Sequence, residues 1–294
     1  MAQRLRTVGS LVRYGARRFR RARLAFGHGT FSAAEEATWL VSHVLKEAPW
    51  AVHPARSDRV LPAAEKRIRA LFDQRIRERI PAAYLMREAW LGGLRFYVDQ
   101  RVIIPRSHIA APLREGLEPW IRDPDRIRSV LDLCTGCGSL AILAARVFAH
   151  ARIDAADISP EALAVARKNV SAHRLRHRIR LVESDLFTKL GGRCYDLILC
   201  NPPYVTASSM RRLPPEYRHE PKIALAGGAD GLGLVRRVMA EAGGHLKPNG
   251  LLVMEVGRGR KGVERAFPAI SFIWPDGAPG SAVFVLERRA LARQ

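Results

Sequence analysis

Residues 130–138 read Val-Leu-Asp-Leu-Cys-Thr-Gly-Cys-Gly, a short apolar run that passes directly into a glycine-containing turn. An apolar pattern resumes at Ser139, so the stretch predicts a strand, a tight loop and a helix in that order. Glycine lets a backbone approach a ligand closely, and the first N–H groups of the following helix have no partner within it. The stretch therefore predicts a ligand-binding loop of an α/β sheet.

Strand and helix patterns alternate on both sides of this loop after residue 126. Strands are expected at 129–133, 151–156, 179–183, 195–200 and 250–256, and helices at 138–148, 160–172 and 231–246. A closing hairpin is expected from 271–274 and 282–287, around Pro275-Asp-Gly277. This alternation indicates βαβ units and a parallel sheet.

The upstream residues follow a different pattern. Apolar residues recur at helical spacing near the N-terminus, and two more helices are expected at 33–46 and 62–79, the first with Ser32 and Glu35 as a capping box. Aromatic and aliphatic residues at 83–104 predict a β-hairpin, followed by a helix at 108–121. We expect three parts: a helical domain at 1–82, a hairpin and linker helix at 83–125, and an α/β domain at 126–294.

The charge of the chain is strongly basic. The 294 residues, about two domains' worth, carry 49 Lys plus Arg against 28 Asp plus Glu, a net charge of +21. Such an excess favours a polyanionic partner, although all but seven of the 49 are Arg, which a biased base composition of the genome also explains. Eight Arg and no acid lie in the first 34 residues. That start fits a transit peptide or a basic helix that touches phosphates.

The cysteines and the hydropathy exclude other classes. Four Cys in a chain of this length do not make a disulfide scaffold, and no apolar run is long enough for a membrane span. Cys134 and Cys137 are spaced like metal or redox ligands, but Cys194 and Cys200 do not form a matching pair. Small buried side chains explain them better, so we expect no metal and a soluble, cytoplasmic protein.

The loop at 134–138 departs from the dinucleotide fingerprint. Cys134 stands at its first glycine position, and Asp132 lies just upstream. A carboxylate there suits a ligand with an amino group, which points to S-adenosylmethionine, although a tight strand–helix turn without a ligand would show the same pattern. Asp157 ends the next strand, 19 residues after Gly138, where an acid can bind ribose hydroxyls.

The most specific motif is Asn201-Pro-Pro-Tyr204, which follows an apolar strand. The two prolines remove two N–H donors, and the Asn201 side-chain oxygen and the Pro202 carbonyl remain as acceptors. Two acceptors beside the ring of Tyr204 suit a planar, conjugated NH2 group, whose nitrogen gains positive charge when it is methylated. The alternative is a rigid Pro-Pro turn without chemistry.

These segments resemble the HemK-like class I methyltransferases, which modify the side-chain amide nitrogen of glutamine in proteins. The resemblance spans nearly the whole chain. It rests on the loop at 132–138, Asp157-Ile-Ser-Pro, Glu183-Ser-Asp185-Leu-Phe187 and Asn201–Tyr204, with further matches at 79–84, 96–106, 220–221 and 227–232. The loop departs from the family pattern because Cys137 and Ser139 look exchanged, and both residues are small. His108 also stands where the family has another residue.

The resemblance implies a fold, a cofactor and residue roles. It implies a Rossmann-like, seven-stranded, mostly parallel sheet, preceded by a small helical domain that recognises the substrate. The implied S-adenosylmethionine site comprises Asp132, Cys134, Thr135, Gly136, Cys137, Gly138, Asp157, Ile158, Asp185, Leu186 and Asn201. The implied substrate site comprises Arg106, Asn201, Pro202, Pro203 and Tyr204, of which Asn201, Pro202 and Tyr204 are catalytic.

Two branches of this family differ in substrate. Glu88-Ala-Trp90, Pro105-Arg-Ser107, Tyr217–Pro221 and Phe26–Thr30 resemble the PrmB-like branch, which modifies a glutamine of large-subunit ribosomal protein L-three. The release-factor branch carries Pro-Arg-Pro-Glu-Thr-Glu after the hairpin and is the alternative. An adenine-N6 nucleic-acid methyltransferase and a non-enzymatic ribosome assembly factor are further alternatives. The branch also suggests that the basic N-terminal arm contacts ribosomal RNA on an assembling particle.

Overall fold

The computed structural model describes residues 7–275 and 282–291, and these form two compact units. The helical unit comprises Met1–Ala89 and Leu213–His219, and the sheet unit comprises Trp90–Arg212 and Glu220–Gln294. The chain therefore leaves the helical unit, builds four of the six strands of the large sheet, and returns once to the helical unit before it completes that sheet. The two units meet between Ala89 and Trp90, and the three parts expected at 1–82, 83–125 and 126–294 stay a prediction.

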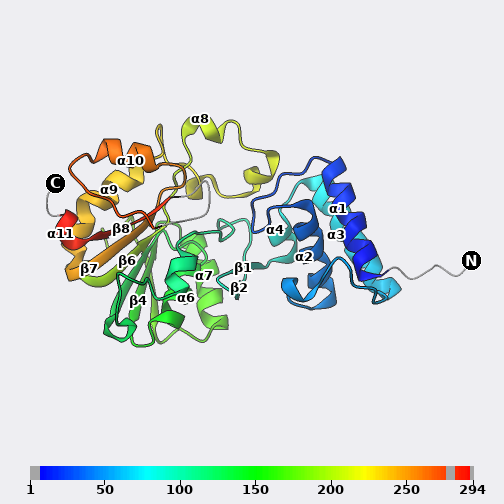
Figure 1. Cartoon of the computed structure of the whole chain (residues 1–294), viewed down its shortest axis with the longest axis horizontal. Coiled ribbons are helices and arrows are strands. Elements are labelled where there is room, and N and C mark those ends of the chain that lie inside the picture. The colour runs from blue at the N-terminus through cyan, green and yellow to red at the C-terminus, as the bar shows by residue number, and fades with distance from the viewer. Residues whose placement is uncertain (1–6, 276–281, 292–294) are drawn as a thin grey trace, which may run out of the picture. The chain divides into compact units, whose positions relative to one another are not determined.

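The sheet unit is built on six strands in the order β5-β4-β3-β6-β7-β8 (Figure 1). Their bounds are β3 Ser129–Leu133, β4 Arg152–Asp157, β5 Ile179–Glu183, β6 Tyr195–Cys200, β7 Leu246–Glu255 and β8 Val283–Glu287. Neighbouring strands are parallel except β7 and β8, which are antiparallel. The strand order reverses between β3 and its neighbours β4 and β6, which is the point where open α/β sheets bind ligands.

Helices cover both faces of this sheet. Its helices are α5 Ala110–Arg114, α6 Ser139–Val147, α7 Pro160–Ala172, α8 Ala207–Met210, α9 Gly233–Ala242, α10 Arg260–Ala266 and α11 Arg288–Leu291. Adjacent strand residues point to opposite faces. Val130 accordingly packs in the core with α5 and α6, and Leu131 packs in the core with α9 and α10. Both faces are apolar, as the continuous apolar strands predict.

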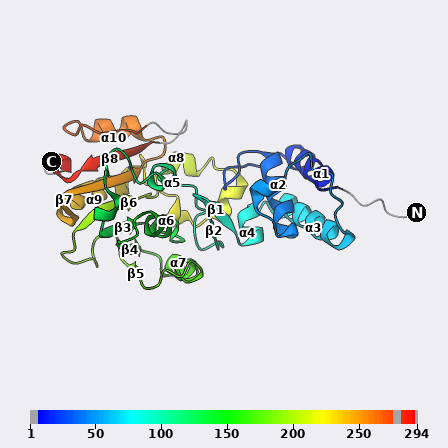
Figure 2. The same cartoon turned by 60° about the horizontal axis from the view of Figure 1, so that its bottom comes forward.

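The helical unit contains α1 Val8–Arg21, α2 Ala33–Leu45, α3 Pro62–Glu78 and α4 Ala82–Met86 (Figure 2). The Thr7 and Ser32 side chains cap α1 and α2, and α3 starts on a proline. Ser32 Oγ accepts from the N–H of Glu35 at 3.2 Å, and the Glu35 carboxylate accepts from Phe31 rather than from Ser32 itself. The capping box is thus present with its return bond shifted by one residue.

Four expected elements are wrong in extent or type. The described residues form six strands rather than seven, because 271–274 makes only a single antiparallel bridge, Ile273 to Val285. The expected turn at Asp276-Gly277 lies outside the described residues. The expected hairpin is confined to β1 Ala89–Leu91 and β2 Leu94–Phe96, since 82–86 is helical, and the helix expected at 108–121 spans only 110–114. Gly116 at φ +74 turns the chain there. The helix expected at 231–246 ends at Ala242.

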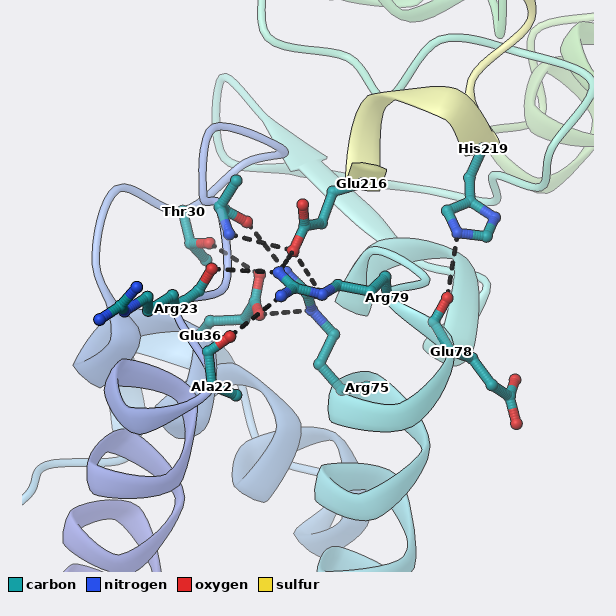
Figure 3. Close-up of polar contacts among 10 residues, drawn as sticks. Ala22, Arg23, Thr30, Glu36, Arg75, Glu78, Arg79, Glu216 and His219 are labelled. Atoms are coloured by element: carbon teal, nitrogen blue, oxygen red, sulfur yellow. Dashed lines mark hydrogen bonds and ion pairs between the residues drawn. The ribbon is translucent and has the colours of Figure 1, made fainter. Parts of the chain in front are cut away.

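A buried ionic cluster holds the returning segment Leu213–His219 in the helical unit (Figure 3). Arg75 has 0% exposure; its Nε donates to Glu36 Oε1 at 2.7 Å, and its Nη1 lies 3.6 Å from Glu216 Oε1. Arg79 Nη1 donates to the same Glu216 oxygen at 2.8 Å. Two arginines thus balance two carboxylates.

The backbone completes this cluster. Arg75 donates to the carbonyl of Ala25, Arg79 donates to the carbonyls of Ala22 and Arg23, and the Ala25 N–H donates to Glu216. Burial would raise the pKa of Glu216, but its bonds to Arg79 and the backbone outweigh it and lower the pKa. Burial raises the pKa of Glu36 in spite of Arg75. His28 and Tyr217 belong to the two segments that resemble one family branch, 26–30 and 217–221. Their ring centroids lie 4.2 Å apart beside this cluster.

Candidate functional site

Nearly all of the residues expected in the site lie at one edge of the sheet. The 134–138 loop follows β3, Asp157 ends β4 and Ile158 follows it, Asp185 and Leu186 follow β5, and Asn201–Tyr204 follow β6. The four strands are parallel neighbours, so their carboxyl ends share an edge. The structure therefore brings the expected cofactor and substrate residues of the sheet together at the strand-order reversal.

The loop after β3 depends on left-handed backbone. Cys134, Gly136 and Gly138 have φ values of +56, +56 and +83. Glycine adopts these values without steric cost, whereas Cys134 pays about 1–2 kcal/mol, a strain found mostly at functional sites. A Cβ on Gly136 or Gly138 would meet no atom closer than 3.4 Å, so the backbone angle is what requires glycine there.

The Asp132 side chain links this loop to the first turn of α6. Its Oδ2 accepts from Thr135 Oγ1 at 2.5 Å and from the N–H of Ala141 at 3.0 Å, in the first turn of α6. Oδ1 is buried and has no hydrogen-bond partner among the described residues. Burial raises the pKa of Asp132 to about 7, against the opposing effect of these two bonds.

Asp157 and Ile158 present different surfaces. The Asp157 carboxylate accepts from the N–H groups of Gly136 at 2.8 Å and Ser159 at 3.0 Å, which fixes it beside the loop. Burial raises its pKa in spite of these bonds. Ile158 follows directly and is 51% exposed, which is unusual for a large apolar side chain.

Asp185 is not a free acceptor in the structure. Its Oδ2 accepts from Arg237 Nη2 at 2.9 Å, and both side chains are exposed. Leu186 is buried at φ +49. The adjacent Ser184 N–H donates to the Asp157 carbonyl at 2.9 Å, which ties the loop after β5 to the end of β4.

The Asn201–Tyr204 segment carries the second orphaned acceptor. The Asn201 Oδ1 atom is buried and has no hydrogen-bond partner within the described part of the chain. An unpaired buried amide oxygen costs about 1–3 kcal/mol, so its retention points to a ligand donor. The backbone beyond is fixed, because Val205 forms a parallel bridge with Ala226.

Three glycines enclose Tyr204. A Cβ on Gly257 would lie 2.5 Å from Tyr204 Cε2, one on Gly227 2.6 Å from Tyr204 Cα, and one on Gly231 2.5 Å from the Tyr204 carbonyl oxygen. Gly257 and Gly231 also have positive φ values of +54 and +80. The position of the tyrosine therefore depends on glycine at three places, and the sequence alone gave no reason to select Gly257.

Glu255 is a site residue that the sequence did not reveal. It ends β7, is 1% exposed, and accepts from the Tyr204 hydroxyl at 3.1 Å through Oε1. Its Oε2 accepts from Ser107 Oγ at 2.7 Å and from the His108 N–H at 2.8 Å. One carboxylate thus positions both Tyr204 and the loop after residue 106, and it gives His108 a backbone role.

Arg106 has a buried partner of its own. Its Nη1 and Nη2 donate to the two oxygens of Glu220 at 2.6 and 2.7 Å, and Glu220 also accepts from the Ile104 N–H at 3.0 Å. A bidentate pair of this kind fixes both partners. The observed contact of Arg106 is therefore with Glu220, and its expected contact with a substrate stays a prediction.

Two of the four cysteines, Cys137 and Cys200, are buried where the thiolate is disfavoured. Burial raises the pKa of Cys137 to about 12 and the pKa of Cys200 well above its usual value. The described residues contain no group of three or more His, Cys, Asp or Glu placed to hold a metal ion. None of the described helices is both long and apolar enough to cross a membrane.

Comparison with known proteins identifies close relatives. A family model described as methyltransferase small domain matches residues 120–213. A protein of Bordetella pertussis named ribosomal protein uL3 glutamine methyltransferase is 50% identical, over 98% of this chain and 96% of the relative. Proteins with the same name from Burkholderia pseudomallei and Neisseria meningitidis serogroup B are 47% and 45% identical, over 97% and 99% of this chain and 96% of each relative.

Proposed function

The chain belongs to the family of ribosomal protein uL3 glutamine methyltransferases, and we propose from that membership that it methylates the side-chain amide nitrogen of a glutamine in uL3, with S-adenosylmethionine as methyl donor. One observation carries the chemistry. The Oδ1 of Asn201 is buried, has no hydrogen-bond partner within residues 7–275 and 282–291, and stands at the carboxyl end of β6, before two prolines and Tyr204. It is an acceptor that an amide N–H of the substrate would satisfy.

The loops after β3, β4 and β5 fit the cofactor. The left-handed loop at 134–138 would surround its methionine part, Asp157 its ribose and Ile158 one face of its adenine. Asp132 Oδ1 has no hydrogen-bond partner among the described residues, so a positively charged amino group would bind favourably near this loop. Asp185 would accept from the adenine amino group either while it keeps its bond to Arg237 or after that bond has broken. S-adenosylmethionine supplies a methyl group on a positively charged sulfur.

Side-chain and backbone groups of the segment 201–204 would orient the glutamine amide nitrogen. Asn201 Oδ1 and the Pro202 carbonyl would accept the two N–H bonds of the glutamine amide, and the ring of Tyr204 would pack on its plane. Held in this way, the amide nitrogen could bond to the cofactor's methyl carbon as the carbon–sulfur bond breaks, and the methylated nitrogen would then lose a proton to water. The fixed acceptor dipoles stabilise the positive charge that develops on nitrogen.

A labelled methyl donor tests this function. The full-length protein is incubated with labelled S-adenosylmethionine and, separately, with uL3, release factor, RNA and DNA. We expect label in uL3 alone, and peptide mass spectrometry should find one added methyl group on a glutamine. Label in release factor would move the chain to the other branch. Label in nucleic acid without label in protein would overturn the assignment.

Replacement of Gly257 by alanine tests how far activity depends on the position of Tyr204. The new Cβ would lie 2.5 Å from Tyr204 Cε2, so the ring must move. We expect kcat/KM for uL3 methylation to fall by about tenfold to a hundredfold, since small displacements of positioning groups have such effects. Gly228→Ala is the matched control, because φ is also positive there (+89) but a Cβ meets nothing within 4 Å. Equal losses in both variants would contradict this role.

Cofactor affinity should depend on pH through Asp132. Its pKa is about 7, above the usual value of 3.8, so the carboxyl is mostly protonated below pH 7. In the free protein, the folded state therefore loses stability as the pH rises from 3.8 to about 7. A cofactor ammonium favours the ionised form, so affinity should rise with pH. We expect Kd to fall about fivefold to tenfold between about pH 6 and pH 7.5, below the titration of the cofactor's own amine.

Calorimetric titration of the wild-type chain and of Asp132→Asn with S-adenosylmethionine measures this dependence. The asparagine variant should bind with an affinity that changes little with pH. A slope retained in the variant would assign the titration to another group, of which Asp157 is the first candidate because burial raises its pKa as well.

The helical unit offers a further contact. We propose that the basic face of α1 meets ribosomal RNA when uL3 is bound to an assembling particle; Arg13, Arg17, Arg20 and Arg21 on this helix are exposed. Residues 1–6 of the same arm lie outside the described part of the chain. A ribosomal substrate supports a cytoplasmic site for the reaction.

A further inference from the structure

A basic groove lies at the edge of the sheet opposite the candidate active site. It encloses a volume of about 350 Å³ where β4 and β5 begin, two strands labelled in Figure 2. The lining residues are Arg152, Ile153, Asp154, Arg176, His177, Arg178, Ile179, Arg180 and Arg193. Five arginines and a histidine therefore surround one carboxylate.

That carboxylate is already engaged. Asp154 accepts from Arg180 Nε and Nη2 at 2.8 Å each, from the Tyr195 hydroxyl at 2.7 Å and from Arg193 Nη1 at 3.3 Å. Burial would raise the pKa of Asp154, but these donors lower it, so the group is ionised. Asp154 can neutralise one of the five arginines only.

Three arginines of the groove remain without a carboxylate partner among the described residues. Arg152 donates to the carbonyl of His177 and Arg176 donates to Ser171 Oγ, while Arg178 donates to backbone carbonyls at 145, 148 and 151. Burial lowers the pKa of Arg178, and the charges of Arg152 and Arg146 lower it further. The groove thus holds positive charge that the chain does not compensate, a condition that favours a bound anion.

The local sequence builds this charge into a fixed surface. Residues 173–180 read His-Arg-Leu-Arg-His-Arg-Ile-Arg, with six basic side chains in eight. The two apolar members, Leu175 and Ile179, are each 5% exposed and belong to the core between α6 and the sheet. Their burial anchors the stretch while Arg176 and His177 stay exposed.

We propose that this groove binds the phosphodiester backbone of RNA, at a site separate from the methyl-transfer site. The planar guanidinium matches phosphate with two parallel hydrogen bonds, which makes arginine well suited to this ligand. The volume equals roughly ten water molecules, enough for more than one phosphate group. A protein partner fits less well, because interfaces between proteins have an apolar centre, and Ile153 and Ile179 of the groove are buried.

The position of the groove allows both sites to be used together. β4 separates Arg152 at the groove from Asp157 at the cofactor loop by about 17 Å of extended strand. RNA held at one edge would leave the other edge open. Such a contact would keep the enzyme on an RNA–protein particle that carries the substrate glutamine.

Binding of labelled RNA by the full-length protein tests the proposal. The probe is fluorescein-labelled single-stranded RNA of mixed sequence and about 20 nucleotides, longer than one small domain covers. Anisotropy gives Kd between about 50 and 300 mM KCl for wild type, for Arg152→Gln/Arg176→Gln, and for the control Arg67→Gln/Arg77→Gln on α3, a helix to which no RNA contact is assigned. The two variants lose the same charge, and all four arginines are exposed. Circular dichroism and thermal unfolding confirm that each is folded.

We expect the groove variant to bind at least tenfold more weakly than the control at the lowest salt. The slope of log K against log [KCl] should be smaller by about 1.4, because two phosphate contacts to a single strand are lost. If the double variant is unfolded, Arg176→Gln alone should lower this slope by about 0.7. Unchanged binding, equal losses in both variants, or no binding by wild type would overturn the proposal. Displacement of RNA by polyglutamate at equal charge would indicate an acidic protein instead, and displacement by inorganic phosphate at equal charge would indicate a simple anion site.

Discussion

Asn201→Ala should lower kcat for uL3 methylation by about a hundredfold to a thousandfold while leaving the affinity for S-adenosylmethionine within about twofold. The substitution removes the buried oxygen that has no hydrogen-bond partner among the described residues. In the reaction this acceptor would hold an N–H bond whose polarity increases as the nitrogen becomes positive. Loss of one preorganised group of this kind has effects of that size on turnover.

Single-turnover methylation with saturating cofactor separates turnover from binding, and calorimetry measures cofactor affinity independently. Asn201→Asp is a useful second variant, because it keeps an acceptor oxygen in nearly the same volume and should retain more activity than alanine. Normal turnover by Asn201→Ala would refute the acceptor role. A large loss of cofactor affinity would instead move Asn201 to the cofactor site.

Arg75→Leu should destabilise the helical unit by about 3–5 kcal/mol, the usual result of leaving a buried charge without its partner. The Glu36 and Glu216 side chains are both fully buried, and both lie against Arg75. Leucine fills much of the volume but supplies no charge. Urea unfolding of the chain, in a background whose other four tryptophans are replaced by phenylalanine, is followed by the fluorescence of Trp39 in α2, which then reports on this unit.

Arg77→Leu is the matched control for this prediction. It makes the same substitution two residues further along α3, but the Arg77 side chain is 73% exposed and pairs with its neighbour Glu78 on the surface. Its effect should stay within about 0.5 kcal/mol. The double variant Glu36→Leu/Arg75→Leu should be less destabilised than the sum of its single variants. Similar unfolding curves for Arg75→Leu and Arg77→Leu would show that the cluster contributes no stability.

Local pattern predicted most of the sheet unit. β3, β5 and β6 begin and end where the apolar runs placed them, and α7 spans the predicted 160–172. Each of these elements depends on residues close in sequence, because strand and helix periodicities are short. Because the strands were predicted to be parallel, the sequence also predicted that Asp157 and Asn201 lie at the same, carboxyl-terminal edge of the sheet. The family resemblance added the substrate branch, which periodicity alone does not contain.

The missed features depend on residues far apart in sequence. Glu255 joins Tyr204 and Ser107 across 51 and 148 positions, and no spacing rule connects them. Glu216 reaches Arg79 across 137 positions. The linker helix was predicted too long because an apolar spacing continues past Gly116, whose left-handed backbone ends it. Local sequence says which residues are apolar, but tertiary partners decide which polar side chains are buried.

The returning segment Leu213–His219 has a consequence for synthesis of the chain. Residues 1–89 leave the ribosome long before Glu216, so α2 and α3 first assemble with Arg75 and Arg79 facing one buried carboxylate instead of two. The helical unit can reach its final charge balance only after the strands β3–β6 have been translated. An N-terminal fragment ending at Ala89 is therefore an incomplete domain, and the helical unit cannot be completed until the segment Leu213–His219 has been translated.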